Sequence, residues 1–151
     1  MMNLEENKTI RVVYVEPGKV AQVIELGTEL EDLQAAVGGN IEPFYPFDEA
    51  VAIVCNDEGK YNGMFPNRAV YGENGEMIDI IFGSFFICDC SGESFGSLSE
   101  KQIKVYKGKF HNPERFFQVN NKIVAVPYKP IIKDKAMRHR GTIPPRYHDA
   151  P

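Results

Sequence analysis

The chain has 151 residues, of which 43% are hydrophobic and 25% are charged, with a formal net charge of −4. This size fits one compact domain, and the composition excludes a collagen-like, fibrous or wholly disordered chain. No apolar run reaches the ~20 residues that a membrane-spanning helix requires. The start is acidic and polar, unlike a secretory signal, and the three cysteines are an odd number. We therefore expect a cytoplasmic protein that makes no contact with a membrane.

Charge is distributed unevenly along the chain. Residues 1–117 carry 10 Lys or Arg and 19 Asp or Glu, a net charge of −9, whereas residues 118–151 carry 7 and 2, a net charge of +5. The second segment also holds five of the ten prolines, which interrupt helices and sheet ladders. This shift predicts an acidic domain over residues 1–117 and a basic, proline-containing tail over residues 118–151 that is extended or partly disordered.

The first predicted element is an antiparallel hairpin. Two β-rich runs, Ile10–Glu16 and Val20–Leu26, flank the tripeptide Pro17-Gly18-Lys19. Proline presets φ and glycine accepts a positive φ, which is what a tight turn between two strands requires.

A helix is predicted next, over residues 28–37. Thr28 and Glu31 have the spacing of a capping box, apolar residues recur at helical spacing after them, and Gly38 can adopt the left-handed conformation that ends a helix. A hairpin followed by a helix is compatible with a β-grasp-like start.

The rest of the domain is predicted to be mostly β-structure. Asn56–Tyr71 is polar and contains glycines, so we expect a long connection there, and Glu73–Glu76 has the composition of a hairpin turn. A second helix is predicted over residues 99–110, opened by a capping box from Ser99 to Gln102. The order of elements indicates an α+β fold with a mostly antiparallel sheet. The remaining strands are predicted at Asn40–Tyr45, Ala50–Cys55, Met77–Phe82 and Ser84–Cys90.

Six short motifs between residues 12 and 117 carry a family resemblance. They are Val15–Gly18, Val37–Glu42, Val54–Lys60, Pro66–Ala69, Ile80–Gly83 and Leu98–Ile103. In this order they resemble a bacterial and phage family catalogued as domain of unknown function 3846. The segment Tyr61–Phe65 departs from the aliphatic stretch that is more usual in the family, and the chain beyond Phe117 has no counterpart in it.

The resemblance implies a biological context more than a mechanism. Such proteins look like accessory products of phages, plasmids and integrative elements, often found beside anti-restriction modules, which implies an anti-defence role. The family supplies no catalytic residues that could be transferred to this chain.

The cysteines raise the question of a metal or a nucleophile. Cys88 and Cys90 are separated by one residue, whereas zinc knuckles use Cys-x2–4-Cys, and with Phe86 they alternate as in a strand. We therefore expect these two, and Cys55, to be small apolar groups of the core. A histidine base would have to come from late in the chain, where His111, His139 and His148 lie. We expect no catalytic residue, no metal and no cofactor.

The best candidate binding site is the predicted connection Asn56–Tyr71. Amides, a guanidinium and phenols are the groups that recognise a planar polar ligand or a phosphate. The alternative is that Asn67 and Arg68 organise the loop internally, through hydrogen bonds to backbone carbonyls and one carboxylate. The candidate ligand- or partner-binding residues are Asn56, Lys60, Tyr61, Asn67, Arg68 and Tyr71.

Three functions follow from these patterns. The first is a non-catalytic accessory protein of a mobile element or phage that binds a host factor or a small nucleotide-like ligand, with the acidic domain able to mimic nucleic acid. The second is an enzyme acting on a nucleotide-like substrate. The third is a nucleic-acid-binding module that uses the basic residues of Lys129–Arg146. The same basic segment could instead fold onto its own acidic domain or onto an acidic partner.

Overall fold

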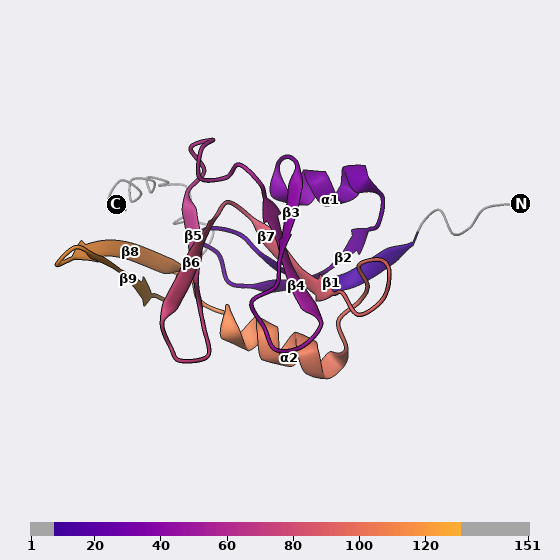
Figure 1. Cartoon of the computed structure of the whole chain (residues 1–151). Coiled ribbons are helices and arrows are strands. Elements are labelled where there is room, and N and C mark those ends of the chain that lie inside the picture. The colour runs from indigo at the N-terminus through magenta and orange to yellow at the C-terminus, as the bar shows by residue number, and fades with distance from the viewer. Residues whose placement is uncertain (1–7, 131–151) are drawn as a thin grey trace, which may run out of the picture.

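The computed structural model describes residues 8–130 and has the α+β fold that the sequence predicts, with two helices, nine strands and antiparallel pairing throughout (Figure 1). No helix in this part of the chain is long and apolar enough to cross a membrane. The helices are α1 (Leu30–Val37) and α2 (Glu100–Lys109). The strands are β1 (Thr9–Val15), β2 (Gln22–Gly27), β3 (Ile41–Phe44), β4 (Val51–Asn56), β5 (Pro66–Tyr71), β6 (Met77–Phe82), β7 (Phe85–Asp89), β8 (Glu114–Val119) and β9 (Lys122–Pro127).

A five-stranded sheet in the order β2-β1-β7-β4-β3 forms the centre of the molecule. β7 lies between strands that precede it by many residues: Ile87 is opposite Val13 of β1 and also opposite Ile53 of β4. All three side chains are completely buried. The smaller sheets are two hairpins, β5–β6 and β8–β9.

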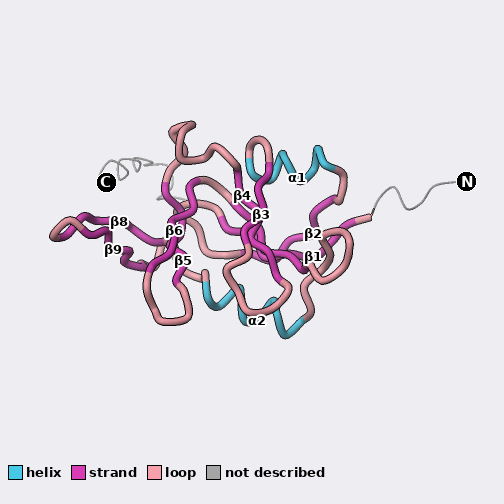
Figure 2. Tube along the Cα trace, viewed as in Figure 1, coloured by secondary structure: helices cyan, strands magenta, loops and turns pink. Residues whose placement is uncertain are grey.

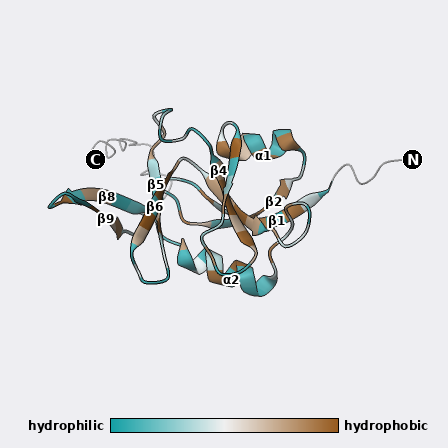
Figure 3. Ribbon diagram, viewed as in Figure 1, coloured by the Kyte–Doolittle hydropathy of each residue, from teal (hydrophilic) through white to brown (hydrophobic). Residues whose placement is uncertain are grey.

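The central sheet is covered on both faces, and its central strands are correspondingly hydrophobic (Figures 2 and 3). Successive side chains of a strand point to opposite faces, so β1, β4 and β7 supply two cores. On one face Phe86 packs with Leu33 and Val37 of α1. On the other face Ile87 packs in a cluster that contains residues of α2 and of the β5–β6 hairpin.

The turns and helix ends agree with the predictions except at the start of α1. Gly18 has φ +79° in the turn between β1 and β2, and Gly38 has φ +80° at the end of α1. The N-cap of α1 is Glu29 and not Thr28, so the predicted capping box is wrong by one residue. The Asp32 carboxylate accepts a hydrogen bond from the Glu29 N–H at 3.2 Å. The hairpin followed by a helix, on which the β-grasp-like expectation rests, is present.

α2 begins with the predicted capping box. The Ser99 hydroxyl accepts from the Gln102 N–H at 3.1 Å, and the Gln102 side chain accepts from the Ser99 N–H at 2.9 Å. Two of the backbone donors at the helix start are therefore satisfied reciprocally.

The predicted connection Asn56–Tyr71 is wrong in its second half, because Pro66–Tyr71 forms β5 and pairs with β6. Asn67 and Arg68 are polar and so favour a loop in the sequence, but in the structure both side chains are fully buried. The hairpin turn that the sequence predicts after β5 is present.

A β8–β9 hairpin follows α2 and projects away from the central sheet (Figure 1). Asn120 and Asn121 form its two-residue loop with φ of +52° and +70°. Asparagine tolerates positive φ better than most residues, and a two-residue hairpin loop of type I′ needs it at both positions. The predicted domain boundary at residue 117 falls inside β8, and residues 131–151 of the predicted tail lie outside the described residues.

Candidate functional site

Arg68 is completely buried in β5, where the fold uses its donors. Its Nε donates to the Phe110 carbonyl at 3.0 Å, and its Nη2 donates to the Lys19 carbonyl at 2.6 Å. Its Nη1 donates to the Asn67 side-chain oxygen at 2.9 Å. One guanidinium therefore connects β5 to the end of α2 and to the turn between β1 and β2.

The charge of Arg68 is accompanied by one carboxylate. Burial lowers the pKa of Arg68 to about 10, against the influence of Glu114, which raises it, so the side chain is a cation at neutral pH. Burial raises the pKa of Glu114, while its hydrogen bond from the Ala69 N–H, at 2.8 Å, and the charge of Arg68 lower it. Glu114 belongs to β8, so this contact also attaches the outer hairpin to β5. The contacts of Arg68 are therefore internal to the fold and involve backbone carbonyls and one carboxylate, as in the alternative to a ligand-binding role.

The two predicted asparagines also bind backbone. Asn67 donates from Nδ2 to the Val15 carbonyl at 3.0 Å and to the Gly83 carbonyl at 2.9 Å. Asn56 donates to the Val37 carbonyl at 3.1 Å and accepts from the Glu58 N–H at 2.7 Å. Both side chains are buried, and these bonds fix the ends of neighbouring elements.

The other three predicted residues lie on the surface. Lys60 forms an ion pair with Asp79, with Nζ and Oδ1 2.8 Å apart. Tyr61 is 86% exposed and Tyr71 is 46% exposed. The structure therefore does not gather the six residues around one cavity, because Asn56, Asn67 and Arg68 are internal while the remaining three face solvent. Their role in binding stays a prediction.

The cysteines occupy the apolar environments that the strand pattern predicts. Cys88 is completely buried in the same cluster as Phe86, and Cys90 packs against that cluster. Cys55 packs against the core on the other face of the sheet. Burial is the main cause that raises the pKa of Cys88 to about 12 and that of Cys55 to about 11. Both thiols are therefore protonated at neutral pH and are weak nucleophiles.

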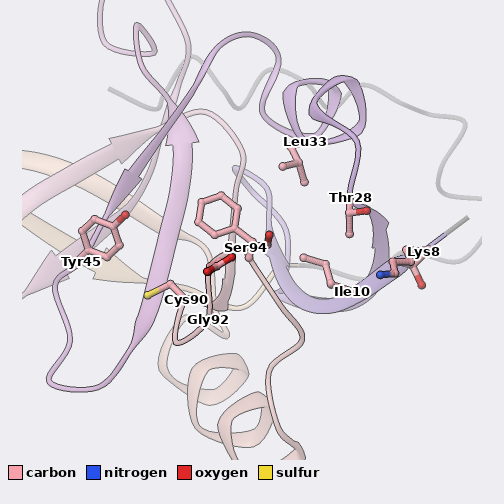
Figure 4. Close-up of a pocket in the computed structure, with 11 residues that line it drawn as sticks. Lys8, Ile10, Thr28, Leu33, Tyr45, Cys90, Gly92 and Ser94 are labelled. Carbon is pink, nitrogen blue, oxygen red and sulfur yellow. The ribbon is translucent and has the colours of Figure 1, made fainter. Parts of the chain in front are cut away.

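A half-open pocket of about 630 Å³ lies near the start of β1, the start of α1 and the loop after β7 (Figure 4). Apolar side chains such as Ile10 and Leu33 line it together with the hydroxyls of Thr28 and Ser94. No local sequence pattern indicates this pocket, because its lining comes from segments far apart in the chain. The full lining is Lys8, Thr9, Ile10, Thr28, Leu33, Tyr45, Cys90, Gly92, Glu93, Ser94 and Phe95.

Acidic and basic residues are concentrated in different parts of the described chain, and the change from one to the other occurs earlier than the predicted boundary at residue 117. Residues 20–99 contain 14 Asp or Glu and only two basic residues, Lys60 and Arg68, the second of which is buried. Residues 100–130 contain seven Lys or Arg and two Glu. The basic segment thus begins at α2, and none of the 14 carboxylates of the preceding segment is buried; we call these carboxylates the acidic surface.

The fold defines a small α+β domain built on a five-stranded antiparallel sheet. A family model described as Domain of unknown function (DUF3846) matches residues 10–111, and the chain belongs to this family. The resemblance that the sequence motifs indicate is thereby confirmed. Comparison with curated proteins and with solved structures gives no match. The family match ends just before β8, so the β8–β9 hairpin lies beyond it.

Proposed function

We propose that this protein is a non-catalytic accessory protein of a mobile element or phage, and that it acts in the cytoplasm by binding a host protein, with an anti-defence role. The observation that carries the proposal is the excess of exposed carboxylates in residues 20–99, together with the internal use of Arg68 and Asn67. These are the side chains best suited to ligand chemistry in the predicted loop, and their donors are directed to backbone carbonyls instead.

The chemistry of the described residues also favours binding over catalysis. A cysteine nucleophile needs a lowered thiol pKa, whereas burial raises the pKa of both Cys55 and Cys88. The carboxyl of Glu114, whose pKa is raised, is hydrogen-bonded to backbone inside the fold. These groups stabilise the structure and are not free to react with a substrate.

The acidic surface of residues 20–99 supports a macromolecular partner. Its 14 carboxylates are opposed by one exposed lysine, Lys60, which is itself paired with Asp79. A dense negative surface attracts basic proteins over about 10 Å at moderate salt, as nucleic acid does. The partner that we propose is therefore a host protein with a basic, nucleic-acid-binding surface.

The pocket between α1 and the loop after β7 favours a second candidate, the binding of a small nucleotide-like ligand. Its volume of about 630 Å³ lies within the range of ligand pockets, roughly 300–1,000 Å³. Its lining combines apolar side chains with hydroxyls, the ammonium of Lys8 and the carboxylate of Glu93, a mixture that suits a planar polar molecule. Nucleic-acid binding through Lys129–Arg146 stays a prediction, because most of that segment lies outside the described residues.

Native mass spectrometry tests the two candidates together. The full chain, purified gently from a bacterial host, is weighed before and after denaturation. A stoichiometric protein partner supports the main proposal, and a small mass lost on denaturation supports the ligand pocket instead. A bare protein from the natural host counts against both.

Two matched variants then test the acidic surface with the partner that is found. Asp57 and Glu58 are changed together to Asn and Gln, and Glu73 and Glu76 are changed together to Gln. All four residues are exposed, so the fold is expected to persist. The proposal is supported if at least one variant binds the partner more weakly than the wild type, and if this difference in affinity disappears as the salt concentration is raised. Unchanged binding by both contradicts an acidic interface in this part of the surface.

A further inference from the structure

One face of the β8–β9 hairpin carries four exposed apolar side chains, which we call the apolar face. Phe117 is directly opposite Val124, while Val119 lies two residues along β8 and Val126 two residues along β9, on the same side. Their exposed fractions are 47%, 39%, 48% and 44%, respectively. Because they are neighbours on the same face and each is partly exposed, they form a continuous apolar strip.

The fold covers the base of the opposite face of this hairpin, although Ile123 near the tip of that face is 50% exposed, and it leaves all four residues of the apolar face partly exposed among residues 8–130. Phe116, on the opposite face, is only 8% exposed, and Glu114 beside it binds the Ala69 backbone. An isolated two-stranded sheet is marginally stable in water, and contiguous exposed apolar side chains mark interaction sites. The hairpin also projects away from the central sheet (Figure 1), where another molecule can reach it.

Charge at the two ends of the apolar face indicates what the partner is. Arg115 lies at its base, opposite Val126, and Lys122 at its tip, opposite Val119. The Arg115 guanidinium is held 4.3 Å from the centre of the Tyr128 ring. The hairpin's one carboxylate, Glu114, is on the opposite face. Along the strand direction the two cations lie four residue positions apart, which is about 14 Å at ~3.4 Å per residue.

This pattern distinguishes between the possible occupants. A second copy laid face to face would bring cations against cations in either orientation, which is unfavourable. Nucleic acid would meet an apolar strip where its phosphates need hydrogen-bond donors. A protein segment with apolar side chains in its middle and a carboxylate at each end can cover the apolar strip and form an ion pair with each of the two cations.

We propose that the apolar face of the β8–β9 hairpin is a second interface, which binds a protein segment whose central apolar side chains cover Phe117 and Val124 and whose flanking carboxylates pair with Arg115 and Lys122. This interface goes beyond the proposed function, because its partner has the opposite charge to the one that the acidic surface attracts. A protein with both interfaces connects two different partners.

Selection of random linear peptides displayed on phage, with the full chain as bait, tests the proposal. The expected peptides have apolar residues between two carboxylates. Val124→Asp and Ile123→Asp form a matched pair of baits, since the residues are adjacent, exposed and on opposite faces of the hairpin. Val124→Asp is expected to weaken binding of a selected peptide about tenfold or more, while Ile123→Asp leaves it within about twofold.

Reversing the charge of Lys122 at the tip of the hairpin shows how far peptide binding depends on the carboxylates and how far on apolar contact. Lys122→Glu is expected to select peptides in which one carboxylate is replaced by Lys or Arg. Peptides without any charge preference, or equal losses for the two aspartate variants, overturn the proposal. So does self-association of the wild type that Val124→Asp abolishes, which would identify a second copy as the occupant. These outcomes are independent of the acidic surface, which all of the hairpin variants retain.

Discussion

The guanidinium of Arg68 is an example of a single residue that connects distant parts of the chain. Its partners Lys19 and Phe110 are 49 and 42 residues away in the sequence. In a site of low dielectric these charge-assisted hydrogen bonds are strong. Arg68 therefore contributes to stability in a way that a surface arginine does not.

Replacing Arg68 by alanine is expected to lower the free energy of unfolding by about 3–5 kcal/mol, because buried carbonyls lose their donor and a cavity remains. Urea denaturation at neutral pH measures this change. Lys60→Ala is the control, since it removes an exposed ion pair worth at most about 1 kcal/mol. Equal stabilities of the two variants would contradict the structural role of Arg68.

The buried thiols give the protein a pH dependence at alkaline pH. Folding raises the pKa of Cys88 from its ordinary value of 9.0 to about 12 and that of Cys55 to about 11. Above pH 9 the unfolded chain loses thiol protons that the folded chain retains, so stability is full below pH 9 and falls as pH rises towards 12. We expect each of the two thiols to contribute a loss of about 2 kcal/mol between pH 9 and pH 11.

Chemical denaturation over this pH range measures the effect, and Cys88→Ala serves as the comparison. This variant is expected to have a shallower decline with pH, even if its stability at pH 7 is lower. A decline of the same slope in wild type and variant would show that Cys88 does not titrate with a raised pKa.

Among the elements, those predicted correctly are those whose signals are local. Apolar runs and glycine turns predict the strands β1, β2, β4, β6 and β7. The capping box of Ser99 and Gln102 predicts the start of α2. In each case the groups concerned lie within a few residues of each other. β5 was missed, since Asn67 and Arg68 look like loop residues until partners far along the chain satisfy them. The pocket and the apolar face of the hairpin depend on tertiary placement, which no local pattern reveals.

The two predicted capping boxes provide a prediction about helices. Ser99→Ala removes a hydroxyl that accepts the Gln102 N–H, and it is expected to lower the free energy of unfolding by about 0.5–2 kcal/mol. Thr28→Ala is the matched control, because the N-cap of α1 is Glu29 and the Thr28 hydroxyl caps nothing. Thermal or urea denaturation of both variants makes the comparison. A larger loss for Thr28→Ala than for Ser99→Ala would restore the capping box that the sequence suggests.

At the scale of the whole molecule, stability is unevenly distributed between the central sheet and the outer hairpin. β7 is paired on both sides and its residues Phe85–Cys88 are buried, whereas most of β8–β9 is exposed. Exposed hydrogen bonds with few apolar contacts open locally without global unfolding.

Hydrogen exchange is expected to follow this division. Amides of β1, β4 and β7 should exchange last, at a rate set by global unfolding, and those near Asn120 and Asn121 should exchange first. Exchange followed by mass spectrometry resolves the segments. Protection of the hairpin equal to that of β7 would show that residues outside the described part, or another molecule, cover it.

The position of β7 also has a consequence for the protein as it is synthesised. β1 and β4 are complete before Phe85 is added, and the strand that joins them comes only afterwards. Until then the central sheet consists of two separate strand pairs, β1–β2 and β3–β4, each with an apolar edge open to pairing with other chains. A product that ends before Phe85 therefore lacks the strand between its halves. The unpaired edges of β1 and β4 make such a fragment prone to aggregation.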